Sequence, residues 1–191
     1  MKIAFFTADA GNYGSARSLA TAIQYLQKNN ILKREEITLI FPKSLIHLEG
    51  NVPQNKIFQE LNYAYWVLPF SRVELKGDEI GSWRKIKAII KNLIAVIMTL
   101  CIYKRRIHRM GLDYIHINSL TLWPLLLVLP HEVKTIIHIR EILDEVRLSM
   151  IPKIARKIIL IKSSKIIAID NMSAKPFINR GREVTIIKNP F

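Results

Sequence analysis

Cysteine is nearly absent from this chain: Cys101 is the only one among its 191 residues. A single cysteine excludes an internal disulfide framework and a zinc site built from several cysteines of one chain. We therefore expect a reducing, cytoplasmic compartment. Half of the residues are apolar, so the chain can bury the core of one domain.

Long hydrophobic runs are missing too. The N-terminal "MKIAFFTADAG" has one basic residue and an apolar stretch too short for a signal peptide. The helix candidate at residues 82–109 is free of charge only over residues 92–103, whereas a membrane span needs roughly 20 apolar residues. This length excludes a transmembrane helix there. An apolar stripe with bases at both ends suits either a core helix or a helix that touches a bilayer. The residues of this stripe are Ile86, Ile89, Ile90, Leu93, Ile97 and Leu100.

Acidic residues are missing from two segments, residues 82–112 and 146–169. The basic residues of these segments account for the whole formal net charge of +14. A basic excess segregated in this way indicates a polyanion, an anionic lipid surface or an acidic partner.

The glycine motifs of common nucleotide sites are absent. Neither Gly-x-Gly-x-x-Gly nor Gly-Lys-Ser/Thr occurs, which argues against NAD or ATP binding by these motifs. The loop at residues 8–15 does hold Gly11 and Gly14, which let a ligand approach the backbone, and Ser15, which can cap the next helix. Arg17 in the first helical turn opposes the helix dipole unless an anion lies nearby. On these residues alone, a ligand loop and a simple turn are equally favoured.

What is present is an alternation of β-rich runs and helix-length segments. Several runs are continuously apolar, as in strands buried on both faces. The runs are residues 2–7, 36–41, 113–118, 134–139, 165–170 and 183–188. The alternation predicts a doubly wound α/β domain, with a mostly parallel, Rossmann-like sheet and helices on both faces. Residues 42–80 are expected to form an irregular excursion with one extra strand.

Polar side chains follow two of these runs. His138 stands near the end of one, where it could do acid–base work with a nearby carboxylate orienting its ring. The plainer interpretation is a hydrogen-bonded core histidine, with Arg140 and Glu141 as a surface pair. Asn118 and Ser119 end another run, where they either cap the next helix or contact a ligand.

The remaining histidines suggest no metal site. His116 alternates with isoleucines and is expected to be a packed side chain. His47, His108 and His131 lack metal-ligand spacing with one another, so we expect no metal.

Five loose motifs in order resemble the N-terminal domain of GT-B glycosyltransferases, of the family 4-like group (group 1) that includes retaining mannosyl- and glucosyltransferases. The motifs are "GSARSL" at 14–19, "LDYIHINS" at 112–119, "HIREI" at 138–142, "KIIAIDN" at 165–171 and "VTIIKNPF" at 184–191. Each is weak alone. Their order and spacing over nearly the whole chain are much more specific.

The resemblance implies sugar transfer from a nucleotide-sugar donor to a polysaccharide or lipid-linked acceptor, without a further cofactor. The loop with Gly11, Gly14 and Ser15 would approach the donor diphosphate, and His138 would lie beside the reacting sugar as the catalytic residue. The residues implied to bind acceptor or substrate are Arg17, Asn118, Ser119, Arg140 and Glu141. The chain departs from the family pattern at Ser15, which replaces a glycine, and in lacking the acidic residue of the loop.

The resemblance also implies one acceptor-binding domain over residues 1–191. The nucleotide-sugar-binding half is expected after Asn-Pro-Phe, so the chain is a truncated form or a lone domain and turns over little by itself. Family members often dock on the inner face of the cytoplasmic membrane, which gives the bases a use. The bases expected to face the membrane are Arg84, Lys85, Lys87, Lys91, Lys104, Arg105, Arg106, Arg109, Lys153, Arg156 and Lys157.

The alternative is a non-catalytic basic α/β domain that binds an anionic membrane or nucleic acid. Nucleic acid is the less favoured partner, because base stacking needs exposed aromatic side chains among the bases. Between Lys85 and Lys165 the aromatic residues are only Tyr103, Tyr114 and Trp123.

Overall fold

The computed structural model describes most of the chain. The described residues are 1–11, 14–42, 48–49, 52–53, 55–60, 63–68, 90, 94, 97, 104–143, 150–178 and 180–188. The basic residues Arg84, Lys85, Lys87 and Lys91 lie outside them, as does the Asn-Pro-Phe ending.

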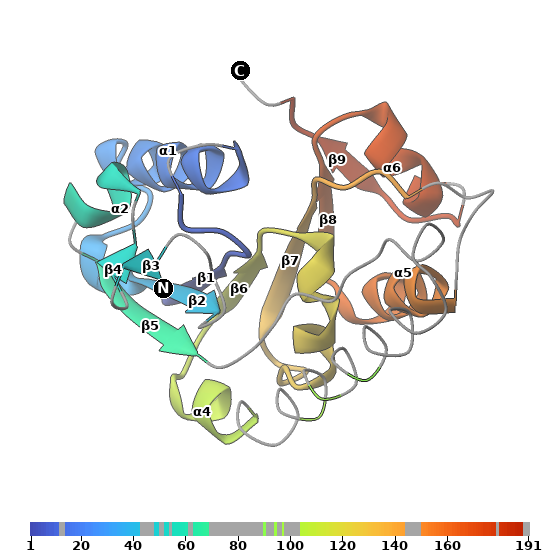
Figure 1. The fold of residues 1–191 in the computed structure, drawn as a ribbon, viewed down its shortest axis with the longest axis horizontal. Helices are drawn as coiled ribbons and strands as arrows, with labels where there is room; N and C mark the ends of the chain where they lie inside the picture. Colours follow the sequence, from blue (N-terminus) through green and yellow to red (C-terminus); the bar gives the residue numbers. More distant parts are fainter. Residues whose placement is uncertain are drawn as a thin grey trace.

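Seven of the described strands form one parallel sheet in the order β5-β2-β1-β6-β7-β8-β9 (Figure 1). They are β1 (Ile3–Phe6), β2 (Ile37–Pro42), β5 (Ala64–Leu68), β6 (Tyr114–Ile117), β7 (Lys134–Ile139), β8 (Lys165–Ala168) and β9 (Val184–Ile186). A short antiparallel pair, β3 (Leu48–Glu49) and β4 (Val52–Pro53), stands apart. The six predicted strands and the doubly wound α/β class are confirmed. Residues 42–80, where one extra strand was expected, hold β3, β4 and β5, of which β5 joins the large sheet at one edge.

Helices cover both faces of the sheet, as Figure 1 shows. They are α1 (Gly14–Lys28), α2 (Lys56–Glu60), α4 (Lys104–Arg109), α5 (Met150–Lys162) and α6 (Asn171–Ile178), with 3-10 helices η1 (Arg34–Glu36) and η3 (Leu120–Leu127). The chain alternates strand and helix because each strand exposes apolar side chains on both faces, and each face needs a cover.

Two buried cores result. On one face, α1 and α2 pack on the sheet around residues such as Phe5, Ile23 and Phe58. On the other, α4, η3, α5 and α6 pack around residues such as Ile117 and Phe177. The two cores fix the strand order, and with it the positions of the strand ends.

The strand order reverses between β1 and β6. From β1 the chain builds outward through β2 to β5, and then returns to β6 and builds the other way. In open α/β sheets, ligands bind outside the carboxyl ends of strands at such a reversal, where helix N-termini also meet. The ends of β1, β6 and β7 are therefore the place to look for a site.

The helix candidate at residues 82–109 is described at its end, as α4, and at three single positions. Ile90, Ile94 and Ile97 are helical and about half exposed, at 50%, 55% and 49%. Ile90 and Ile97 belong to the predicted apolar stripe, so these two positions do not fit a buried core helix. Within the described residues, no helix is both long and apolar enough to cross a membrane.

Candidate functional site

The loop after β1 is held in shape by hydrogen bonds of its own. The buried hydroxyl of Thr7 donates to the carbonyl of Asp9 at 2.8 Å, and the Asp9 carboxylate accepts from the N–H of Gly11 at 3.0 Å. Asn55 reaches in from the start of α2: its side-chain N–H donates to the carbonyl of Gly11 at 2.8 Å. The part of the loop up to Gly11 is therefore held in a fixed shape next to the strand-order reversal.

The start of α1 depends on a glycine. Gly14 has a φ of +60°, which disfavours residues with a Cβ. The helix begins at Gly14, so Ser15 lies inside its first turn and the prediction that Ser15 caps the helix was wrong. The carbonyl of Ser15 instead accepts from the side-chain N–H of the buried Asn118, at 3.1 Å. Arg17 is exposed on the same turn.

Arg140 joins three elements at this edge. Its Nε donates to Oδ1 of Asn118 at 3.0 Å, at the end of β6. Its Nη2 donates to the hydroxyl of Ser18 on α1 at 3.2 Å and lies 3.4 Å from Nδ1 of His138. The structure thus brings together four of the predicted site residues, Ser15, Asn118, His138 and Arg140, in one hydrogen-bonded group.

Two histidines lie side by side on the sheet. The rings of His116 and His138 are 5.9 Å apart between centroids, at 79°, and the ring of Phe5 lies 5.4 Å from that of His116. His116 is a packed side chain, as predicted. Nδ1 of His116 and Nε2 of His138 are buried and have no hydrogen-bond partner among the described residues.

Burial and a neighbouring cation keep both histidines neutral. Burial first, and then the Arg140 charge, lower the pKa of His116 from 6.5 to about 4. The same two causes, with a smaller one from His116, lower the pKa of His138 to about 3. Burial also lowers the pKa of Arg140, although the Glu141 carboxylate opposes this. Near neutral pH the group therefore holds one cation and two uncharged imidazoles.

Glu141 turns away from His138 toward η3. Its carboxylate accepts from the hydroxyl of Ser119, from the N–H of Leu120 at 2.9 Å and from the N–H of Arg140 at 3.1 Å. Arg140 and Glu141 are therefore not a surface pair. Glu141 is also not the carboxylate that orients the histidine ring; the group at that ring is a guanidinium. Asp144 and Glu145, which follow in sequence, lie outside the described residues.

Ser119 caps the next helix, as one of the two interpretations predicted. Its hydroxyl accepts from the N–H of Thr121 at 3.1 Å. The helix that it caps, η3, is a 3-10 helix that includes Pro124. The side-chain oxygens of Ser119 and Glu141 thus accept hydrogen bonds from the first N–H groups of η3. Contact of these two residues with a substrate stays a prediction.

Three residues of this group were not predicted from the sequence to belong to the site: Thr7, Ser18 and Asn55. Asn55 is the N-cap of α2, because its Oδ1 accepts from the N–H of Phe58 at 3.2 Å. An asparagine directly before a helix-forming segment is a sequence signal for this role. Thr7 and Ser18 are small polar residues in or beside apolar runs, and no pattern distinguishes them from ordinary core and surface positions.

The described bases among those predicted to face the membrane lie on α4 and α5, two helices of one layer. Arg105 and Arg109 on α4, and Lys153 and Lys157 on α5, are exposed, and Arg156 is half-buried. Both helices pack against the same core, through Ile107 and through Ala155 and Ile159. Lys104 and Arg106 also belong to α4.

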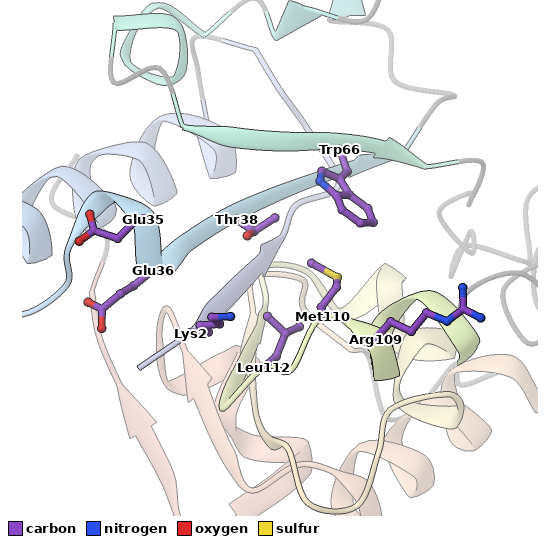
Figure 2. Close-up of a pocket in the computed structure, with 8 residues that line it drawn as sticks. All are labelled: Lys2, Glu35, Glu36, Thr38, Trp66, Arg109, Met110 and Leu112. Carbon is purple, nitrogen blue, oxygen red and sulfur yellow. The ribbon is translucent and has the colours of Figure 1, made fainter.

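A cavity of about 670 Å³ lies at the opposite, amino-terminal edge of the sheet. Figure 2 shows the Trp66 indole facing Met110 and Leu112, with Glu35 and Glu36 at one end and Arg109 at the other. Glu36 is engaged there, because its carboxylate accepts from the N-terminal amine at 2.6 Å. The cavity is thus remote from the strand-order reversal and contains none of the predicted catalytic or substrate-binding residues.

No set of three or more His, Cys, Asp or Glu side chains is arranged to hold a metal ion within the described part of the chain. The described polar groups around Arg140 are amide, hydroxyl, imidazole and guanidinium, and the nearby carboxylates of Asp9 and Glu141 already accept backbone N–H bonds. Such a group can offer hydrogen bonds and positive charge to a polar or anionic ligand.

No protein-family model and no curated protein matches this chain. Solved structures share its fold along its whole length. HepE of Anabaena, in complex with UDP-glucose, is 18% identical with a TM-score of 0.60, and the match covers 44% of HepE. The lipopolysaccharide outer core galactosyltransferase WaaB, in its apo form, is 11% identical with a TM-score of 0.62, and 46% of it is covered. The chain thus has the fold of a stretch about half as long as each of these two proteins.

Proposed function

We propose that this chain is the acceptor-side, N-terminal half of a GT-B glycosyltransferase. It would act in transfer of a sugar from a nucleotide-sugar donor to a glycan or lipid-linked acceptor. The nucleotide-sugar is a substrate here, and the reaction needs no further cofactor. A second domain of the same protein would supply the nucleotide site.

One observation carries this proposal. Residues from three motifs that are far apart in sequence meet at the carboxyl edge: Ser15 from the first, Asn118 from the second, and His138 and Arg140 from the third. Loose motifs that matched by chance would have no reason to share hydrogen bonds. The fold shared with HepE and WaaB supports the same conclusion.

The chemistry available here is hydrogen bonding and charge stabilisation. Transfer from a nucleotide-sugar builds negative charge on the leaving diphosphate, which backbone N–H groups and cations stabilise in the transition state. We expect the N-terminus of α1 to stabilise this charge. Gly11, Gly14 and Ser15 lie before or in its first turn. Arg17, Asn118, Ser119, Arg140 and Glu141 remain the proposed substrate-side residues, and His138 the group beside the reacting sugar.

Turnover tests the proposal. A form with both halves should release nucleoside diphosphate from UDP-glucose, UDP-galactose or GDP-mannose when lipid-linked or polysaccharide acceptors are added. The 191-residue chain should release little, because the donor would be held by the other half. If the two-half form consumes none of these donors with any acceptor fraction, the proposal fails.

We further propose that the layer of α4 and α5 docks on an anionic membrane at the cytoplasmic face. Ile154 and Ile161 on α5 are 43% and 66% exposed next to Lys153 and Lys157. Ile90, Ile94 and Ile97 form an exposed helical face at i, i+4 and i+7 spacing. Apolar side chains among bases suit a surface that rests in lipid headgroups. Nucleic acid suits it less, because Trp123 is buried and Tyr114 is half-buried.

Charge reversal of Lys153 and Lys157 should weaken binding to phosphatidylglycerol vesicles by at least about tenfold, since each base near an anionic surface contributes about 1 kcal/mol. Co-sedimentation at low salt measures this. The control reverses Lys28 and Lys33, which are exposed near the end of α1 on the other face and should leave binding unchanged. Equal binding of wild type to neutral and anionic vesicles would contradict membrane docking.

A further inference from the structure

Arg140 can only donate hydrogen bonds, and this constrains the histidine beside it. A guanidinium has five N–H groups and no acceptor atom. Its Nη2 lies 3.4 Å from Nδ1 of His138, so a hydrogen bond between them requires a lone pair on Nδ1. In a neutral imidazole the proton must then be on Nε2.

The position of Arg140 is fixed by other contacts. Nε donates to Asn118 and Nη2 donates to Ser18, so the guanidinium is held between the end of β6 and α1. His138 and Arg140 are two residues apart at the end of β7, where alternate side chains leave on the same side of the strand. The geometry is therefore set by the backbone and by two further elements.

We propose that Arg140 is a positioning residue that fixes the His138 ring with its proton on Nε2, so that His138 can donate a hydrogen bond but cannot act as a base. The consequence for catalysis rests on the proposed function; the tautomer itself does not. Nε2 is buried and has no partner among the described residues, as expected of a donor kept for a ligand group.

The environment favours the same state. Burial and the adjacent Arg140 cation both disfavour an imidazolium, and the pKa of His138 is lowered to about 3. Among the described residues, the titratable groups recorded at the ring are Arg140, directly after the same strand, and His116 on β6. None of them carries negative charge, so nothing described at the ring would stabilise a second proton.

Nitrogen NMR of the 191-residue chain with ¹⁵N-labelled histidine tests this directly. The chain has five histidines, and loss of one set of signals in His138→Gln assigns those of His138. At pH 7, wild type should show an unprotonated Nδ1 and a protonated Nε2. A wild-type His138 with its proton on Nδ1, or with both nitrogens protonated, overturns the proposal before any Arg140 variant is made.

In Arg140→Met, both neutral tautomers of His138 should become populated. The ¹⁵N chemical shifts of its two ring nitrogens should therefore move toward each other. Arg180→Met is the control, because Arg180 is exposed after α6, and it should leave these signals in place. If Arg140 does not set the tautomer, Arg140→Met will be folded and keep the unchanged Nε2–H tautomer, and the proposal fails. Should this variant not fold, Arg140→Leu takes its place: a changed tautomer supports the proposal, and an unchanged one overturns it.

Activity separates this inference from the proposed function. In a form with both halves, Arg140→Met should lower kcat by roughly 10–100-fold, the loss seen when groups that orient a metal-bound histidine are removed. The KM for the nucleotide-sugar should change little. An absence of any transferase activity would contradict the proposed function, but it would not affect the NMR result. A changed tautomer in Arg140→Met with an unchanged kcat would show that the tautomer does not contribute to the reaction.

Discussion

Replacing His138 by alanine in a form with both halves should lower kcat by about 10²–10³-fold, the usual loss when one preorganised donor to the transition state is removed. The imidazole is neutral and its Nδ1 is taken by Arg140, so its contribution is an N–H group at Nε2. Since Nε2 is buried, the ring or its cover must shift when substrate binds. Steady-state kinetics with the active nucleotide-sugar measures the loss.

His138→Gln separates donation from acid–base work. The glutamine side chain can place an N–H group near the position of Nε2, so this variant should recover part of the lost kcat, whereas a base would not be replaced. The control is His131→Ala, because His131 is exposed and 3.4 Å from Lys162, away from the edge. Equal losses in the alanine and glutamine variants, with a kcat that falls at acid pH near 6.5, would contradict a donor role.

The sheet was predictable because its signal is carried by many residues at once. Each of the six expected strands is a run of Ile, Val, Phe or Tyr, and such runs form strands that are buried on both faces. Strand β5 was expected only as an unspecified extra strand, since its segment mixes aromatic residues with prolines. An edge strand has one neighbour, and Tyr65 and Trp66 are accordingly exposed.

The positions of the site residues were also predictable, but their partners were not. Polar residues after buried strands must lie at the carboxyl edge, which placed Asn118 and His138 together. Arg140 and Glu141 looked like a surface pair because they are adjacent and opposite in charge. Adjacent residues of an extended chain point to opposite sides, however, so Arg140 joins His138 and Glu141 turns to η3. The alternation along the strand would have predicted this.

Acid should destabilise the chain well above the pH at which its carboxylates titrate. The pKa values of His116 and His138 are about 4 and about 3 in the folded protein, against 6.5 for a free side chain. Below pH 6.5 the unfolded chain therefore binds protons that the folded chain does not, and the free energy of unfolding falls as the pH falls. Above pH 6.5 both states are unprotonated, and this contribution is constant.

Between pH 7 and pH 5 the loss should be roughly 2–4 kcal/mol, a large share of the usual 5–15 kcal/mol of a domain. Urea unfolding at the two pH values measures it. Asp170 and Glu36 have lowered pKa values, so their contribution is lost only below their ordinary values near pH 4. His138→Gln should remove about half of the dependence, while His131→Gln should leave it unchanged. A free energy of unfolding that is level from pH 7 to pH 5 would mean that the two imidazoles are not buried as neutral groups, and the donor role of His138 would lose its physical basis.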